Sequence, residues 1–334
     1  MRAWTYAEHG APVDVLRLDP SATMPAPGPG QVALDVLACG LNFADSLLCR
    51  GTYQERPPLP ATPGLEVVGR VVGDGRRVVA LPALPHGGLA DRCLAAVPDT
   101  FPLPDDVDDV TAAALPITYG TAWVGLFRRG GLQAGETVLV HAAAGGTGSA
   151  AVQLAVDAGA RVLATAGGPD KVAHALALGA EEAWDSRAAG FDLVEAVRGV
   201  TGGRGVDIVF DPVGGDLFDA SRRVVAPEGR LLVVGFAAGR VPEAPANHLL
   251  VKNYSVVGVH WGLYRTFDPG VLATAHAGML DALRRGTVAP LVGAVRPLHE
   301  AAAAIDDLAA GRTTGKVVIR VAGAAPATSR PNRG

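Results

Sequence analysis

The chain has 334 residues, of which 49% are hydrophobic and 19% charged, and its formal net charge is −4. This length predicts two domains. No stretch of the sequence is enriched in Lys or Arg, which argues against a nucleic-acid partner. The first residues lack an apolar signal core, and no apolar run reaches the ~20 residues of a membrane span. Three widely spaced cysteines predict neither a disulfide framework nor a metal site, so we expect a cytoplasmic protein.

The first third of the chain predicts an irregular β-rich domain. Short apolar runs punctuated by Pro and Gly are typical of strands. We expect such strands at Gln31–Leu37, Glu66–Val72 and Arg77–Leu81. Strands and helices do not alternate in this region, which separates it from the middle of the chain.

From Thr137 onward strands and helices alternate, which predicts a doubly wound parallel sheet with helices on both faces. The expected strands are Thr137–His141, Arg161–Ala166, Val206–Phe210, Leu231–Gly235 and Tyr254–Val259. The expected helices are Ser149–Ala158, Lys171–Leu178, Leu193–Gly199 and Leu217–Val225. Beyond Trp261 we expect helices at Val271–Arg285 and Leu298–Ala310, strands at Leu291–Val295 and Gly315–Val321, and then a disordered tail.

A glycine-rich turn joins the first strand and helix of this alternation. It includes Ala144, Gly145, Gly146, Thr147 and Gly148, with Ala143 where the first glycine of G-x-G-x-x-G is expected. Glycines let the backbone approach a pyrophosphate, and the amides at the helix N-terminus face that anion. The turn therefore predicts a dinucleotide site.

The end of the second strand bears on which nucleotide binds. NAD sites usually carry Asp or Glu there, whereas this strand ends in Ala166, Gly167 and Gly168 and is followed by Lys171. A cation beside small residues suits a 2′-phosphate and favours NADPH. Two observations leave an alternative open: Lys171 fits a solvated helix position, and an inward Asp170 would repel a phosphate.

Several segments resemble the quinone oxidoreductase (zeta-crystallin-like) branch of the zinc-independent medium-chain dehydrogenases/reductases. They span nearly the whole chain and include LNFADSLLCRGTY, PGLEVVGRVV, AAALPITYGTAW, GETVLVHAAAGGTGSAAVQLA, GVDIVFDPVGG and RTTGKVVIRV. The resemblance implies an α/β fold in which a Rossmann domain, 118–260, is inserted into a GroES-like catalytic domain, 1–117 and 261–334. It also implies NADPH and a homodimer.

The resemblance implies further cofactor contacts beyond the glycine turn. It predicts them at Thr121, Gly167, Lys171, Ser186, Val213, Gly235, Phe236, His260, Trp261 and Arg312. Arg312 matches a family arginine that reaches the 2′-phosphate. Ser186 stands where many relatives carry a Tyr that helps to hold the same phosphate, so this chain departs from the pattern there.

Zinc alcohol dehydrogenases share this fold, but their ligands are missing here. Asn42 stands at the Cys position and Leu65 at the His position of the G-H-E motif. Leucine cannot bind a metal, so no catalytic zinc is expected. His86, His141 and His260 lack ligand spacing and are interpreted as structural histidines.

Without a Lewis acid, hydride transfer suits an acceptor that is already activated by conjugation. The protein then positions the acceptor and donates hydrogen bonds to the oxygen that becomes negative. Asn42 and Tyr53, which match cleft positions in relatives, are the candidate catalytic donors. Asn42 fits equally well as the cap of a helix that begins at Phe43, and Tyr53 as a packed aromatic residue.

Three functions are compatible with these residues. The first is NADPH-dependent reduction of quinones. The second is reduction of an activated C=C bond in an enone or enoyl thioester, disfavoured because Phe236 follows Gly235 where related enoyl reductases often carry Lys. The third is non-catalytic NADPH binding.

Overall fold

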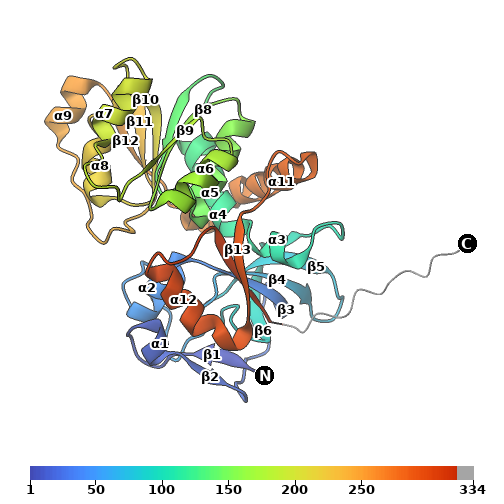
Figure 1. Ribbon diagram of the computed structural model, residues 1–334. Helices are drawn as coiled ribbons and strands as arrows, with labels where there is room; N and C mark the ends of the chain where they lie inside the picture. The colour runs from blue at the N-terminus through green and yellow to red at the C-terminus, as the bar shows by residue number, and fades with distance from the viewer. Residues whose placement is uncertain (322–334) are drawn as a thin grey trace, which may run out of the picture. The chain divides into compact units, whose positions relative to one another are not determined.

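The computed structural model describes residues 1–321, so the predicted disorder after Val321 lies outside the described residues. The chain divides into two compact units (Figure 1). Unit 1 comprises Met1–Ala113, Val295–Asp306 and the residues from Val318, and unit 2 comprises Ala114–Ala294 and Asp307–Val317.

These bounds differ from the predicted division into 1–117 plus 261–334 and 118–260 mainly over residues 261–294. That stretch falls in unit 2 because α11 (Pro269–Arg285) packs against α4 (Pro116–Trp123), and α10 (Tyr264–Phe267) packs against α11. The division into two functional domains at the predicted boundaries stays a prediction.

Unit 2 is built on a six-stranded parallel sheet of order β12-β11-β10-β7-β8-β9. Its strands are β7 (Thr137–Val140), β8 (Arg161–Ala166), β9 (Glu182–Asp185), β10 (Val206–Asp211), β11 (Val225–Val233) and β12 (Ser255–Gly258). This is the strand order of the Rossmann fold, whose ligands bind where the order reverses, here between β7 and β10. The predicted doubly wound sheet is confirmed, with β9 as a strand that the sequence pattern did not indicate.

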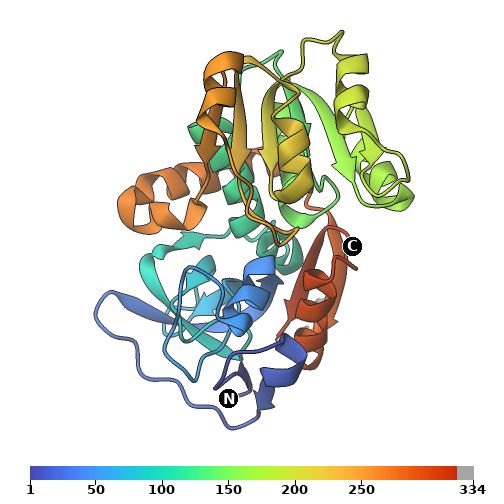
Figure 2. The ribbon, with the colours of Figure 1, turned by 90° about the vertical axis from the view of Figure 1, so that its left-hand side faces the viewer.

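Helices cover both faces of this sheet, as the second view shows (Figure 2). α5 (Gly146–Asp157) packs on β7 and β8, and α6 (Pro169–Ala177) packs on β8 and β9. α7 (Leu193–Val200) buries Leu193, Val194 and Val197 in a core cluster that includes Leu139 and Val209. α8 (Gly215–Ser221) adds Phe218 to the same cluster. α7 therefore presents one helical stripe to the strands.

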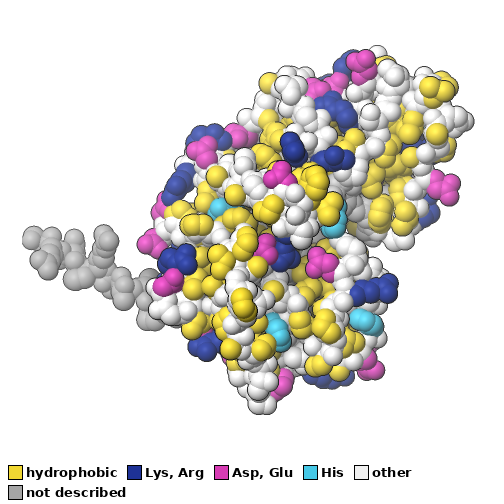
Figure 3. All heavy atoms as spheres, turned by 180° about the vertical axis from the view of Figure 1, so that it is seen from behind, with side chains coloured by type: hydrophobic (Ala, Val, Ile, Leu, Met, Phe, Trp, Pro, Cys, Tyr) yellow, Lys and Arg dark blue, Asp and Glu magenta, His cyan; other side chains and the backbone are white. Residues whose placement is uncertain are grey.

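One end of unit 2 exposes an apolar surface. β12 is an edge strand of the sheet, and α9 (Ala246–Lys252) precedes it in the chain. Leu250 and Val251 of α9 are 81% and 83% exposed, and Val241 is 65% exposed. Hydrophobic side chains also gather at this end in the space-filling view (Figure 3). Large exposed apolar side chains beside the open edge of a sheet are typical of a surface that contacts another chain.

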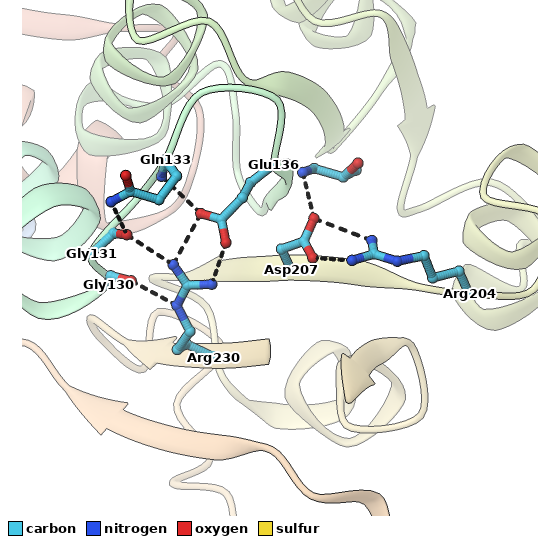
Figure 4. A network of polar contacts seen from close by, with 8 residues as sticks. Gly130, Gly131, Gln133, Glu136, Arg204, Asp207 and Arg230 are labelled. Carbon is cyan, nitrogen blue, oxygen red and sulfur yellow. Dashed lines mark hydrogen bonds and ion pairs between the residues drawn. The ribbon is translucent and has the colours of Figure 1, made fainter. Parts of the chain in front are cut away.

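A polar network fixes the amino ends of the central strands (Figure 4). Arg230 of β11 pairs with Glu136 at 2.7 Å and donates to the carbonyl oxygen of Gly130 at 2.6 Å. Asp207 of β10 accepts from the backbone N–H of Thr137 at 2.8 Å and pairs with Arg204. Both carboxylates therefore tie β7 to its neighbours, on the edge opposite the carboxyl ends where the glycine turn lies.

Unit 1 is built around a six-stranded sheet in which β3 to β6 pair antiparallel, and the expected β-rich domain is confirmed. The strand order is β13-β14-β3-β4-β5-β6, and β3 also pairs with β6, which closes β3 to β6 into a ring. The strands are β3 (Gln31–Leu41), β4 (Glu66–Val71), β5 (Arg77–Pro82), β6 (Arg92–Pro102), β13 (Val292–Pro297) and β14 (Lys316–Arg320); the first residues of β13 and β14 are assigned to unit 2. β6 was not predicted, and β3 runs past the expected end at Leu37 as far as Leu41.

Short elements complete both units. Those of unit 1 are β1 (Ala3–Thr5), α1 (Pro12–Val15), β2 (Arg17–Asp19), α2 (Phe43–Arg50), α3 (Asp109–Ala113) and η3 (Leu298–Glu300); α12 (Ala301–Ala309) begins in unit 1, and its residues from Asp307 are assigned to unit 2. Those of unit 2 are the π-helical η1 (Val124–Arg129) and η2 (Trp261–Leu263). Among residues 1–321, no helix combines the length and apolar character that crossing a membrane requires.

Candidate functional site

The glycine turn follows β7 and leads directly into α5. Gly145 is the N-cap of the helix, and its N–H donates to the carbonyl oxygen of Ala142 at 2.8 Å. Ala142 adopts a positive φ of 51°, which is uncommon for a residue with a side chain. A Cβ on Gly148 would lie 2.1 Å from that carbonyl oxygen. The helix can pack this closely on the turn only because Gly148 has no side chain.

The helix begins earlier than the sequence predicts. α5 starts at Gly146 and not at the expected Ser149, so Thr147 and Gly148 belong to its first turn. The turn is anchored to its neighbours by backbone bonds. Ala143 N–H donates to Thr165 of β8 at 2.9 Å, and Gly315 N–H donates to Ala144 at 2.7 Å. The amides of the first helical turn have no intrahelical partner, and such amides can receive an anion.

The end of β8 carries no carboxylate, as predicted. Gly168 N–H donates instead to Asp185, at the end of β9, at 2.8 Å. Asp170 is exposed in the first turn of α6. Lys171 lies one residue further along, half-buried, and its Nζ donates to the carbonyl oxygen of Gly311 at 2.9 Å. Lys171 is therefore partly buried and held by a contact, and its role toward a phosphate stays a prediction.

Two cationic residues lie close to Lys171. Burial and, next, the guanidinium of Arg187 hold the pKa of the Lys171 ammonium below its ordinary value. A Cβ on Gly167 would lie 2.7 Å from Arg187 Nε, so the arginine side chain covers the end of β8. Arg312 follows Gly311 and pairs with Asp307 at 2.8 Å. The structure brings together Gly167, Lys171 and the loop that carries Arg312.

Arg187 was missed by the sequence analysis. It follows Ser186, which is half-buried and donates its hydroxyl to the carbonyl oxygen of Ala166 at 3.2 Å. The departure of Ser186 from the tyrosine of many relatives was visible in the sequence. That the next residue turns its side chain back over β8 was not visible, because this depends on the path of the loop after β9.

The remaining predicted cofactor residues lie on unit 2. Val213 follows β10, and its N–H donates to the buried carboxylate of Asp211 at 2.8 Å. Gly235 and Phe236 follow β11, and Phe236 is 40% exposed. These loops therefore follow the carboxyl ends of β10 and β11, the edge of the sheet to which ligands bind.

Thr121, His260 and Trp261 form another part of unit 2. Thr121 is half-buried in α4, His260 is exposed, and Trp261 begins η2. A Cβ on Gly120 would lie 2.5 Å from Trp261 Nε1, so the indole lies directly on the turn of α4 that precedes Thr121. The structure thus brings Trp261 and Thr121 into one region. It gives no cofactor role to either, and those roles stay predictions.

Asn42 lies in unit 1, at the junction of β3 and α2. It is the N-cap of α2, the position that the alternative interpretation gave it, and its N–H donates to Asp45 at 2.8 Å. Its side-chain amide donates to Glu66 Oε1 at 2.7 Å. Asn42 is 8% exposed, and Glu66 and Asp45 are completely buried. Asp45 also accepts from the N–H of Gly64 at 2.9 Å, which joins α2 to the segment that leads into β4.

Glu66 and Asp45 are functional candidates that the sequence analysis left out. Glu66 is the third residue of Gly64-Leu65-Glu66, so the motif compared with G-H-E contained the signal. Leu65 is buried at the expected histidine position. Among residues 1–321, no group of three or more His, Cys, Asp or Glu side chains could hold a metal ion. Tyr53 is half-buried in a bend after α2.

Comparison with known proteins identifies the family. Residues 28–93 match the family described as alcohol dehydrogenase GroES-like domain, and residues 146–277 match the family described as zinc-binding dehydrogenase. Quinone oxidoreductase-like protein 2 of Bos taurus is 41% identical over 302 residues, which cover 87% of this chain and 85% of the relative. The chain therefore belongs to the medium-chain dehydrogenase/reductase superfamily, in its zinc-independent quinone oxidoreductase branch.

Solved structures agree with this assignment. The quinone oxidoreductase of Thermus thermophilus, also solved in complex with NADPH, is 38% identical, with a TM-score of 0.81 over 96% of this chain and 100% of that chain. The CurK enoyl reductase is 29% identical, with a TM-score of 0.82 over 96% of this chain and 99% of that one. The predicted fold is confirmed, and the family makes the chain an oxidoreductase.

Proposed function

We propose that this chain is an NADPH-dependent oxidoreductase that transfers hydride to quinones without a metal ion. The single observation that carries the cofactor is the end of β8, where the strand itself ends without a carboxylate, the nearby Asp185 is held by backbone N–H groups, and Lys171 and Arg187 lie together. The glycine turn fits the rest of a dinucleotide, because Gly148 leaves no room for a side chain. The Thermus thermophilus relative, whose structure contains NADPH, supports the same choice.

Bound NADPH would supply the hydride. The residues of this chain supply the binding site: the amides at the start of α5 for the pyrophosphate, and Lys171 with Arg312 for the 2′-phosphate. Tyr53 would donate a hydrogen bond to the developing oxyanion of the acceptor, and Asn42 would do so through the amide N–H that makes a long contact of 3.4 Å with the carbonyl oxygen of Gly40. Leu65 in the ligand position leaves the site without zinc as a Lewis acid, which favours acceptors already activated by conjugation.

Reduction of an activated C=C bond is the second candidate, supported by the similarity to the CurK enoyl reductase. Phe236 in place of a Lys removes one proton donor from that chemistry. The test is NADPH oxidation by the purified protein with 1,4-benzoquinone, an enone and an enoyl-CoA, measured side by side. The proposal predicts the largest kcat/KM for the quinone. A larger kcat/KM for the enoyl-CoA would favour reduction of activated C=C bonds as the function. Absence of turnover with all three acceptors would favour non-catalytic NADPH binding.

A further inference from the structure

Arg187 follows β9, but its side chain reaches the end of β8, the strand whose end carries the ribose-binding carboxylate in NAD-preferring enzymes. β9 ends at Asp185, whose carboxylate accepts from the backbone N–H of Arg187 at 2.9 Å and of Gly168 at 2.8 Å. This clamp joins the loop after β9 to the loop after β8. Built onto Gly167, a Cβ would lie 2.7 Å from Nε and 3.0 Å from Cζ of Arg187. The guanidinium therefore lies over the end of β8, where the acidic residue of NAD sites stands.

The two cations expected to bind phosphate are already engaged in this structure. Lys171 Nζ donates to the carbonyl oxygen of Gly311 at 2.9 Å, and Arg312 pairs with Asp307. The Arg187 guanidinium has no hydrogen bond or ion pair with another residue in the range 1–321. A guanidinium offers five N–H donors in a plane that matches phosphate oxygens in pairs. Arg187 can therefore bind an anion without breaking a hydrogen bond, although its guanidinium also attracts the carboxylate of Asp185, whose pKa is lowered by the backbone N–H groups of Arg187 and Gly168 and, to a smaller extent, by this attraction.

The charges around this point favour a dianion. Arg187 and Lys171 lie close enough that the arginine lowers the pKa of the lysine, so the two cations repel each other. Asp185 is the nearby carboxylate: its oxygen Oδ1 accepts from two backbone N–H groups, and its charge also attracts the Arg187 guanidinium. A phosphate bound beside both cations would replace their repulsion with attraction.

We propose that Arg187 is a specificity-determining residue that binds the 2′-phosphate of NADPH, in the role that many relatives give to a tyrosine at the position of Ser186. The inference rests on the proposed use of NADPH. It changes the sequence-based assignment in one respect: the main phosphate contact comes from the residue after Ser186, with Lys171 in support.

The test is the affinity of the full-length chain for NADPH and NADH, measured by fluorescence titration, and for 2′,5′-ADP and ADP, measured by calorimetry. In Arg187→Gln the dissociation constant for NADPH and for 2′,5′-ADP should rise about 10- to 100-fold. The constants for NADH and ADP should change by less than about twofold, because neither ligand carries the 2′-phosphate. Arg187→Lys keeps the positive charge but loses the planar guanidinium. Its dissociation constants for NADPH and 2′,5′-ADP should lie between those of the wild type and those of Arg187→Gln.

Arg198→Gln is the matched control, since Arg198 is an exposed arginine of α7 in the same unit and its loss changes the net charge equally. It should leave all four affinities unchanged. If the wild type prefers NADPH and Arg187→Gln keeps that preference, Arg187 is not the determinant and the proposed function stands. If Arg187→Gln weakens all four ligands equally, the residue acts on the fold and the inference is wrong. A wild type that binds NADPH and NADH equally would overturn the cofactor proposal itself.

Discussion

Replacement of Asn42 by Ala should destabilise unit 1 as well as slow the reaction. The substitution removes the amide that donates to the completely buried Glu66 at 2.7 Å. A buried acceptor that loses a donor costs about 1–3 kcal/mol. The bond from Asn42 N–H to Asp45 is made by the backbone and survives the change, whereas the half of the capping box in which the Asn42 side chain accepts from the backbone N–H of Asp45 is lost. We therefore expect a loss of about 2 kcal/mol in the free energy of unfolding of this unit.

Tyr53→Phe is compared with Asn42→Ala, because it removes only the hydroxyl of a half-buried side chain in a bend. If Tyr53 donates to the acceptor oxygen, kcat with a quinone should fall roughly tenfold, which corresponds to about 1.4 kcal/mol. Asn42→Ala should lower kcat further, since it alters both a donor and the position of α2. Neither variant should change the affinity for NADPH, because both residues belong to unit 1 and the predicted cofactor residues to unit 2.

Calorimetric unfolding, steady-state kinetics and cofactor titration separate these effects. Thr23→Ala is the control, because Thr23 is exposed in unit 1 and the loss of its side chain should leave stability and turnover unchanged. Unchanged unfolding of Asn42→Ala would show that the contact with Glu66 contributes nothing to stability. Full turnover in both variants would refute the donor assignment, and catalysis would then depend on cofactor positioning alone.

Three further predictions concern cofactor, metal and assembly. Lys171→Ala should raise the KM for NADPH several-fold and leave the KM for NADH nearly unchanged, and equal use of both cofactors by the wild type would contradict this. Dialysis against a chelator should leave turnover intact and elemental analysis should find no stoichiometric zinc, whereas a zinc ion whose removal abolishes activity would refute the metal-free mechanism. Light scattering should give about twice the 34.0 kDa of one chain at micromolar concentration, and Val251→Lys should shift the protein toward monomer. A wild-type monomer would exclude the predicted pairing through β12 and α9.

The Rossmann unit was predictable because its signals are local. Buried parallel strands appear as short apolar runs, and helices between them end at Gly159 and Gly179, where the chain adopts positive φ angles of 77° and 104°. β9 escaped notice because Glu182–Asp185 is an edge strand with an exposed or half-buried residue at each position, so it lacks an apolar run. β6 escaped for a related reason: its 11 residues include Pro98 and Pro102, which normally argue against a strand.

The site was less predictable because its key contacts join residues that are distant in sequence. Asn42 and Glu66 are 24 positions apart, and the contact follows from the antiparallel pairing of β3 with β4, which places Gly40 opposite Glu66. Lys171 and Gly311 are 140 positions apart. Even the cation nearest to the end of β8 comes from the loop after the next strand, β9.

In a dinucleotide-binding site the fold fixes the positions of the glycines more firmly than the positions of the charged residues. A glycine motif marks where the pyrophosphate of a cofactor lies, because larger residues do not fit there. At Gly148, for example, a Cβ would clash with the carbonyl oxygen of Ala142. The charge that distinguishes NADPH from NADH can be supplied by any neighbouring loop long enough to reach the 2′-phosphate. Relatives can therefore use a tyrosine where this chain has Ser186, and this chain can use Arg187, while the fold stays unchanged.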